Sequence, residues 1–109
     1  IADHFIGKKD NDHYVIPIED ILFFESIDRY IYLYTKNNKY QIKERLFELE
    51  IILDTQKYIR ISNSAIINRR SIKKITPQIG SKFVLTMIND SKLVVTRNYY
   101  YKFKEFFKI

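Results

Sequence analysis

The 109-residue sequence contains no cysteine and no tryptophan, and it has only two glycines and two prolines. The absence of cysteine excludes disulfide bonds, thiolate zinc sites and a cysteine nucleophile. No apolar run approaches the roughly 18 residues that a membrane span requires, and no signal-peptide pattern is present. Glycine-rich phosphate loops and nucleophile-elbow motifs are also missing. We therefore expect a cytoplasmic protein that is not an enzyme and that uses neither a membrane, a metal nor another cofactor.

Histidine is also scarce, and its two copies both lie in the acidic first part of the chain. Asp10, Asp12 and His13 offer oxygen and nitrogen ligands, but their spacing matches no defined metal motif. None of the many carboxylates stands in a hydrophobic setting that would tune it for acid–base chemistry. We interpret the stretch around His13 as a solvated loop.

What the chain does contain is enough apolar material for one packed domain, since 46% of the residues are hydrophobic and 16% are aromatic. Neither a low-complexity linker nor an internal repeat divides the sequence. Residues 1–109 are therefore predicted to form a single domain. Because the sequence starts with Ile1 rather than Met, we expect this domain to be one part of a longer protein.

Positive charge is concentrated in the second half of the chain. Residues 1–54 carry seven Lys/Arg and eleven Asp/Glu, a net charge of −4, whereas residues 55–109 carry twelve and two, a net charge of +10. Such a basic segment favours a polyanionic partner, because each phosphate that it neutralises releases condensed counterions. A basic surface that serves solubility, or a lysine-rich proteome, is the alternative.

Alternation of apolar and polar residues, which is typical of half-buried strands, dominates the chain. In residues 30–35 it places three tyrosines on one face and Ile31 and Leu33 on the other. Turns are predicted at Asn37-Asn38, where asparagine tolerates positive φ, and at Asn89-Asp90. The predicted strands span residues 14–18, 21–26, 30–35, 58–61, 65–68, 72–76, 82–88 and 92–96.

Two segments have helical spacing instead, and we interpret their apolar stripes as core packing. The first is residues 42–53, and the second is the C-terminal segment, for which Asn98 is the predicted N-cap. Together the patterns predict a mainly β, mostly antiparallel domain with one or two short helices. The stripes consist of Ile42, Leu46, Leu49 and Leu53 in the first segment and of Tyr99, Phe103 and Phe106 in the second.

Two polar segments of the basic half are candidates for reading DNA. Ser62-Asn63-Ser64 is predicted to form a tight turn, because these side chains bond their own backbone. That turn would project Asn63, whose amide can pair with adenine in the major groove. Arg97, at a predicted junction of strand and helix, can reach the acceptors of guanine. A purely structural turn for Asn63, and an ion pair or a cap for Arg97, are the alternatives.

Three segments of the chain resemble the LytTR-type DNA-binding domain. Residues 18–33 are similar to its opening strands, and residues 58–75 are similar to its most recognisable segment. That segment runs from an aromatic-x-Arg strand through a His/Asn-Ser turn and an apolar-Asn step to an Ile-x-x-Ile strand. Residues 93–99 match the apolar-Arg junction before the last helix. The resemblance extends from Tyr14 to Phe107, in the order of the family.

The resemblance implies an elongated antiparallel β-strand sandwich of small sheets, and the function of a bacterial transcriptional regulator. Members are usually C-terminal output domains of response regulators, so it implies a receiver or sensor domain before this one. They bind direct repeats of double-stranded DNA with loops in successive major grooves, which implies a domain that is monomeric alone and paired on DNA. Ser62 stands where His is common, and the first loop lacks His, which bears on base preference.

The resemblance also implies which residues contact DNA. Three loops give three base-contacting residues: Arg29, Asn63 and Arg97. Phosphate contacts position the protein without specifying sequence, although Arg60 could equally be a structural strand residue. The candidates for backbone contacts are Lys57, Arg60, Ser62, Ser64, Arg69, Arg70, Lys73, Lys74 and Asn98.

Two other kinds of binding module stay open at this stage. Tyr30, Tyr32 and Tyr34 on one strand face could stack the bases of single-stranded nucleic acid or RNA. Against this, the face lies in the acidic half, and tyrosine favours strands in any case. A protein-interaction module whose basic face meets an acidic partner is the other alternative.

Overall fold

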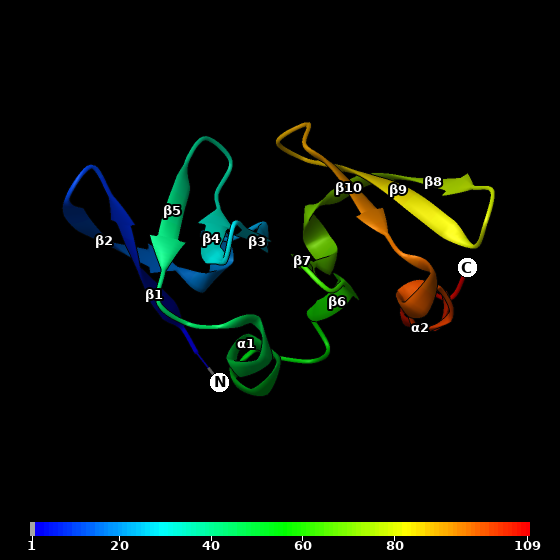
Figure 1. The fold of residues 1–109 in the computed structure, drawn as a ribbon, viewed down its shortest axis with the longest axis horizontal. Coiled ribbons are helices and arrows are strands. Elements are labelled where there is room, and N and C mark those ends of the chain that lie inside the picture. Colours follow the sequence, from blue (N-terminus) through cyan, green and yellow to red (C-terminus); the bar gives the residue numbers. More distant parts are fainter. Residues whose placement is uncertain (1) are drawn as a thin grey trace.

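The computed structural model describes residues 2–109, which are almost entirely organised in short strands and turns (Figure 1). Three 3-10 turns, η1 (Ile18–Asp20), η2 (Arg69–Ser71) and η3 (Arg97–Tyr99), connect the larger elements. The strands and helices of these residues are β1 (His4–Lys9), β2 (Asp12–Pro17), β3 (Phe23–Ile27), β4 (Tyr30–Tyr34), β5 (Lys39–Ile42), α1 (Leu46–Ile52), β6 (Tyr58–Ser62), β7 (Ala65–Asn68), β8 (Ile72–Gln78), β9 (Lys82–Met87), β10 (Lys92–Val95) and α2 (Tyr100–Phe107).

The strands form two sheets in which every pair is antiparallel. The larger has seven strands in the order β2-β1-β5-β4-β3-β7-β6, and the smaller has three in the order β10-β9-β8. Figure 1 shows the smaller sheet beside β6 and β7, with α1 and α2 below the sheets. The domain is elongated, with extents of 42 × 26 × 24 Å. The predicted fold class is confirmed.

Two hydrophobic cores share the central strands β3, β6 and β7. Successive strand residues point to opposite faces, so Phe24 packs in the core that α1 covers, and Phe23 packs in the core that α2 covers. The same division separates Ile66 from Ile67 in β7. Burial on both faces explains why residues 21–24 are a continuous apolar run rather than an alternating one.

The eight predicted strands are all present, with ends that differ by at most two residues. The sequence patterns missed two strands: β1, whose Phe5 is buried in the first core, and β5, which follows the β4–β5 turn. They also misplaced the loop around His13, which lies in β2 of the β1–β2 hairpin. The true turn is Asp10-Asn11, where both residues have positive φ (52° and 68°).

The first predicted helix is shorter than expected because Ile42, the first residue of the prediction, belongs to strand β5. Ile42 pairs with Ile31 in the β4–β5 ladder, so the helix cannot begin there. It begins after Arg45, whose backbone N–H donates to the Glu48 carboxylate at 2.9 Å. The helical stripe is correct for Leu46 and Leu49, which are buried.

Two predictions about asparagine were wrong. Asn98 does not cap α2: it lies inside η3, Tyr99 precedes the helix, and no side chain caps it. At the β4–β5 hairpin, the Thr35 N–H donates to the Asn38 carbonyl at 2.9 Å, so the central turn residues are 36 and 37. The residues with positive φ in the described part of the chain do not include Asn37 or Asn38.

No helix in residues 2–109 is long and apolar enough to cross a bilayer.

Candidate nucleic-acid interface

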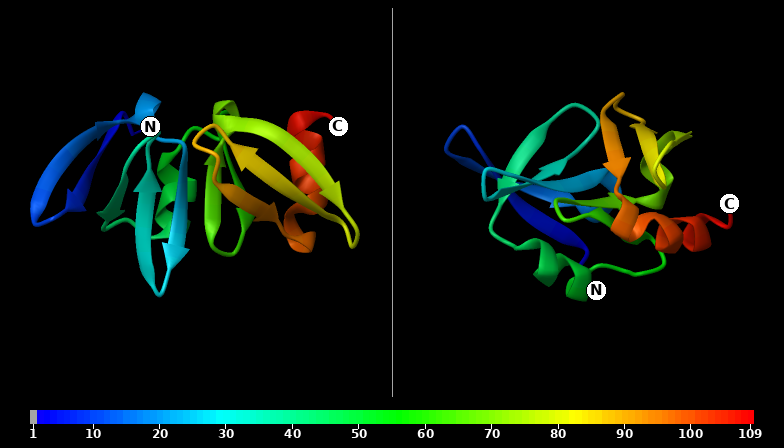
Figure 2. Two further views of the ribbon diagram at one scale, coloured as in Figure 1. Left: turned by 90° about the horizontal axis from the view of Figure 1, so that it is seen from above. Right: turned by 45° about the vertical axis from the view of Figure 1, so that its right-hand side comes forward.

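Four turns that are far apart in the sequence lie along one long side of the domain. They are Asp28-Arg29 between β3 and β4, Asn63-Ser64 between β6 and β7, residues 79–81 between β8 and β9, and Arg97-Asn98 after β10. The left panel of Figure 2 shows them projecting to the same side. We call this side the loop end. The opposite end carries η1, η2 and the β9–β10 turn.

Hydrogen bonds between strands hold the turns of the loop end in register. The Ser26 N–H donates to the Ser64 carbonyl at 2.8 Å, which places the β3–β4 turn beside the β6–β7 turn. The Thr96 N–H donates to the Ile61 carbonyl at 3.0 Å, which brings the end of β10 to the same place. The three predicted base-contacting residues are therefore brought to one surface.

Arg29 lies in a two-residue hairpin turn, because Ile27 pairs with Tyr30. Asp28 and Arg29 both have positive φ, 49° and 71°. This mirror-image turn matches the twist of the strands, but it favours Gly or Asn over Asp-Arg. Each such non-glycine residue costs of order 1 kcal/mol, and strained residues of this kind cluster at functional sites. Arg29 is exposed in this turn.

Asn63 is exposed at the tip of the predicted Ser-Asn-Ser turn, which is confirmed. The Ser64 N–H donates to the Ser62 hydroxyl at 3.1 Å, so the buried Ser62 side chain is used inside the turn. Arg60 donates from Nε to the Ser62 carbonyl at 3.0 Å and from a terminal nitrogen to the Asn63 carbonyl at 2.7 Å. The Tyr99 hydroxyl lies 3.2 Å from the Asn63 Oδ1. The turn is thus held through both backbone and side chain.

Arg60 is fixed in turn by α1. Its guanidinium makes an ion pair with Glu50 at 3.0 Å, and 19% of its side chain is exposed. All three guanidinium nitrogens are therefore engaged within the chain.

Arg97 is exposed at the junction of β10 and η3. Its Nε donates to the Gly80 carbonyl at 3.4 Å, so the β8–β9 turn supports the side chain. A Cβ on Gly80 would come within 3.9 Å of the guanidinium, and the φ of +91° at Gly80 disfavours any other residue. Within residues 2–109 the Arg97 side chain makes no ion pair. Asn98 is also exposed there.

Five of the predicted backbone-contacting residues lie at the opposite end. The register of the β6–β7 hairpin shows this, since Tyr58 pairs with Asn68 at one end and Ser62 with Ala65 at the other. Lys73 there makes an ion pair with Asp90 at 2.7 Å, which lowers the pKa of the Asp90 carboxyl. The five residues are Lys57, Arg69, Arg70, Lys73 and Lys74.

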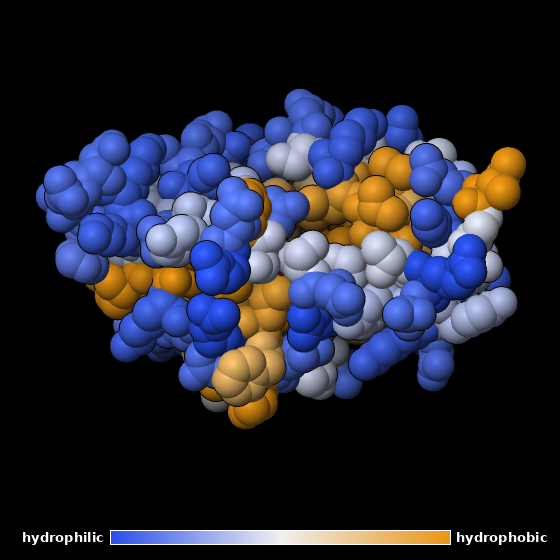
Figure 3. Space-filling view, viewed as in Figure 1, coloured by the Kyte–Doolittle hydropathy of each residue, from blue (hydrophilic) through white to orange (hydrophobic). Residues whose placement is uncertain are grey.

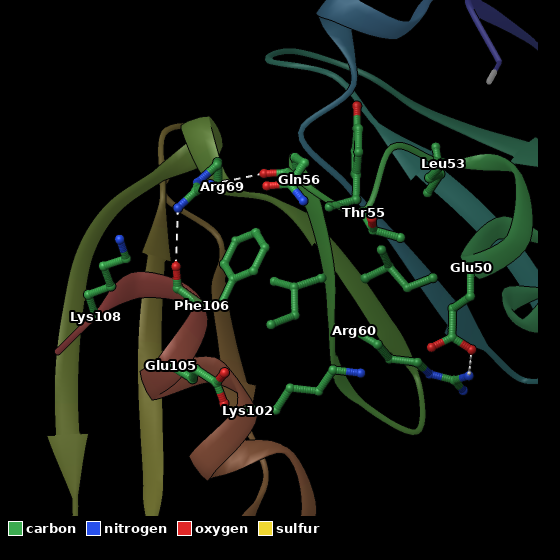
Figure 4. Close-up of a pocket in the computed structure, with 13 residues that line it drawn as sticks. Glu50, Leu53, Thr55, Gln56, Arg60, Arg69, Lys102, Glu105, Phe106 and Lys108 are labelled. Carbon is green, nitrogen blue, oxygen red and sulfur yellow. Dashed lines mark hydrogen bonds and ion pairs between the residues drawn. The ribbon is translucent and has the colours of Figure 1, made fainter.

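Arg69 belongs to a cleft of 720 Å³ between β6, the segment that follows α1, and α2 (Figure 4). Its guanidinium donates to the carbonyls of Gln56 at 2.9 Å and Phe106 at 3.2 Å, and it lies 4.3 Å from the Phe106 ring centroid. Arg60 and Glu50 form the other wall. These charged groups tie α1, β6 and α2 together.

Three residues at the loop end are not among those that the sequence predicts to contact DNA. Lys82 pairs with Gln78 beside the β8–β9 turn, and Lys43 directly follows β5 where that strand reaches the β3–β4 turn. Both are exposed cations. Tyr99 was assigned only to the core. The signal available for the lysines was their place next to hairpin turns, whereas nothing in the sequence links Tyr99 to Asn63.

The tyrosine face of β4 is largely occupied by neighbours. Tyr34 stacks on Phe23 with ring centroids 4.3 Å apart, and its hydroxyl donates to Glu25 at 3.0 Å. Burial, with the Glu25 charge, raises the pKa of Tyr34. The Lys39 ammonium lies 4.8 Å from the Tyr32 ring centroid. Tyr32 and Tyr34 are partly buried, and Tyr30, at 55% exposed, is the most exposed ring of this face.

Figure 3, in the view of Figure 1, shows the face from which the loop end projects. Hydrophilic surface covers most of it, and the apolar surface is broken into separate patches. One patch lies over α1, where Phe47 and Ile51 are exposed. In the part of the chain that the structure describes, no three His, Asp or Glu side chains are grouped to hold a metal ion.

The family model of the LytTr DNA-binding domain matches residues 11–108. The chain belongs to the LytTR family. A solved LytTr DNA-binding domain from Bacillus cereus superposes with a TM-score of 0.94, at 25% identity over 99% of both chains. This LytTR chain is therefore a DNA-binding domain that acts in transcriptional regulation, as the resemblance of its three segments predicted.

The LytTR chain is also similar to transcriptional regulators of Staphylococcus aureus. One from strain bovine RF122 / ET3-1 is 39% identical over 70 residues, and one from strain NCTC 8325 / PS 47 is 37% identical. Both are named uncharacterized HTH-type transcriptional regulators. Each match covers 64% of this chain and 47% of the relative, so the match spans about half the length of these curated relatives. A helix-turn-helix motif joins its two helices by a short turn. In this chain five strands separate α1 from α2.

Proposed function

We propose that this LytTR domain binds duplex DNA in a sequence-specific way by placing the loop end in successive major grooves. The observation that carries the proposal is the convergence of Arg29, Asn63 and Arg97, from distant parts of the chain, on one side of an elongated domain. Its longest extent of 42 Å exceeds the rise of one turn of B-DNA, about 34 Å. Turns arranged along that axis can reach two grooves on one face of the duplex.

The chemistry of each turn suits a different base. The exposed guanidinium groups of Arg29 and Arg97 match the paired O6 and N7 acceptors of guanine. The Asn63 amide matches the N6 donor and N7 acceptor of adenine. Charge at the loop end also supports phosphate contacts, which position the protein on the duplex. We assign these contacts to Ser64, Asn98, Lys43 and Lys82.

The predicted backbone contacts of the opposite end stay a separate hypothesis. Lys57, Arg70 and Lys74 are exposed there, and they can reach phosphates only if the DNA bends around the domain. Single alanine variants distinguish the two sets, because each lost phosphate contact lowers the salt slope of binding by about 0.9.

The domain would act as the output part of a longer cytoplasmic regulator. The S. aureus relatives are about twice as long as the matched segment, and the Bacillus cereus domain comes from a protein described as a methyl-accepting/DNA response regulator. A receiver or sensor domain would then control binding to direct repeats, with single domains pairing on the DNA.

Selection of duplexes from a random library tests the proposal. The enriched duplex is then compared with a scrambled duplex and with its single strands, at several salt concentrations. We expect one enriched motif, recovered as a repeat, a steep salt dependence, and weak binding of single strands. Equal binding of enriched and scrambled duplexes would contradict base reading, and preferential binding of single strands would contradict the proposal as a whole.

A further inference from the structure

We infer that Tyr99 is a positioning residue that fixes the Asn63 amide in one orientation and thereby makes the β6–β7 turn selective for adenine over guanine. This inference rests on the proposed function, since it concerns how the same loop end reads a base. It starts from the contact between the Tyr99 hydroxyl and the Asn63 Oδ1, at 3.2 Å across 36 positions of sequence.

The main chain of the turn is already fixed without Tyr99. Arg60 donates to the carbonyls of Ser62 and Asn63, and Glu50 holds Arg60 in place. The remaining freedom of Asn63 is the rotation of its side chain. In the described part of the chain, the Tyr99 hydroxyl is the one group that bonds the amide.

The Tyr99 hydroxyl is itself held in position. Its ring is half-buried and packs against the second core, and its backbone N–H donates to the Thr96 carbonyl at 2.9 Å. The Tyr99 hydroxyl donates to Oδ1 of Asn63, so in this structure the Nδ2 group points away from Tyr99. The direction in which the Asn63 amide faces thus depends on Tyr99, which follows Arg97 by two residues.

A fixed amide matters because adenine and guanine differ in one group of the major groove. Adenine presents the N6 donor beside the N7 acceptor, whereas guanine presents two acceptors, O6 and N7. The amide oxygen has two lone pairs. One accepts from Tyr99 and the other stays available for the N6 donor of adenine. A rotated amide would turn Nδ2 towards the O6 of guanine and would break the hydrogen bond that the Tyr99 hydroxyl donates to Oδ1.

The test is Tyr99→Phe, which removes the hydroxyl and keeps the ring in the core. Binding is measured to the enriched duplex and to a duplex with guanine in place of adenine at the position where Asn63→Ala relaxes preference. We expect Tyr99→Phe to lower the adenine-over-guanine ratio roughly three- to tenfold, the size of one hydrogen bond. Thermal stability and binding to the scrambled duplex should stay at the wild-type level.

Tyr101→Phe is the matched control, since Tyr101 is 72% exposed and follows by two residues on α2. It should leave the ratio unchanged. In the Asn63→Ala background, Tyr99→Phe should have no further effect on the ratio, because its action passes through the amide.

Three results would overturn the inference while leaving the proposed function intact. They are a wild-type ratio in Tyr99→Phe, an equal effect of Tyr99→Phe with and without Asn63, and a preferred base other than adenine at the Asn63 position. If the wild-type domain selects no duplex at all, the proposed function fails and the inference falls with it.

Discussion

At the loop end, the Arg97 guanidinium is exposed and has one long hydrogen bond to the Gly80 carbonyl. At the opposite end, the Arg69 guanidinium donates to two carbonyls and lies against the Phe106 ring. Both residues belong to the same basic half, and both carry full charge. The comparison teaches that a count of positive residues does not distinguish an exposed arginine from one whose guanidinium is bonded inside the chain.

The largest expected effect comes from removing a buried side chain of the second core. Phe103 is fully buried in the second core and contacts the rings of Phe83 and Phe107. We expect Phe103→Ala to lower the free energy of unfolding by about 3–5 kcal/mol, measured by urea denaturation. Tyr101→Ala on the exposed face of α2 is the control and should cost under about 1 kcal/mol. Equal effects would show that α2 does not anchor the core.

Loss of Arg97 should affect binding and leave the fold intact. Arg97→Ala removes an exposed guanidinium, so the free energy of unfolding should stay within about 0.5 kcal/mol of wild type. Binding to the enriched duplex should weaken by roughly 1–3 kcal/mol, with preference relaxed at one base position. Titrations against enriched and scrambled duplexes measure both effects. Wild-type behaviour on both duplexes would remove Arg97 from the interface.

Loss of Arg69 should show the reverse pattern. Arg69→Ala removes two hydrogen bonds and the contact with Phe106, so we expect a loss of about 1–2 kcal/mol in stability. Base preference should stay that of the wild type when binding is measured well below the melting temperature. Arg70→Ala serves as the neighbouring control, because Arg70 is exposed. A change in base preference with unchanged stability would reverse the assignment of the two ends.

The opposite end also holds a buried tyrosine, Tyr58, whose pKa is raised. Burial raises the pKa of Tyr58 to about 12, while the unfolded chain titrates near 10. The unfolded state therefore loses this proton first, and stability falls as the pH rises from about 10 to about 12. Tyr58→Phe should flatten this decline by at most about 1.4 kcal/mol per pH unit. Denaturation curves across that range check it, and an unchanged slope would contradict a buried Tyr58 hydroxyl.

The smallest expected effect concerns backbone strain at the loop end. Arg29→Gly suits the positive φ of the β3–β4 turn, so the free energy of unfolding should rise by about 1 kcal/mol while DNA binding weakens. Arg29→Ala removes the same side chain without relieving the strain. If both variants bind DNA as the wild type does, Arg29 is a turn residue and not a reading residue.

The sequence by itself determined eight of the ten strands in the described residues, and the Ser-Asn-Ser turn. These follow from local rules: side chains alternate along a strand, and serine and asparagine bond their own backbone in turns. The same rules failed at Ile42, because pairing with Ile31 outweighs the helical spacing, and at Asn98, because η3 precedes α2.

Only the tertiary structure decided which polar residues share a surface. Arg29, Asn63 and Arg97 lie together because antiparallel pairing returns each turn to the same end of the sheets, whereas Arg69 and Lys73 fall at the other end of the same strands. The contact between Tyr99 and Asn63 joins residues 36 positions apart. Neither the direction in which a hairpin points nor a contact across such a separation is encoded in local periodicity, because both depend on how strands pair.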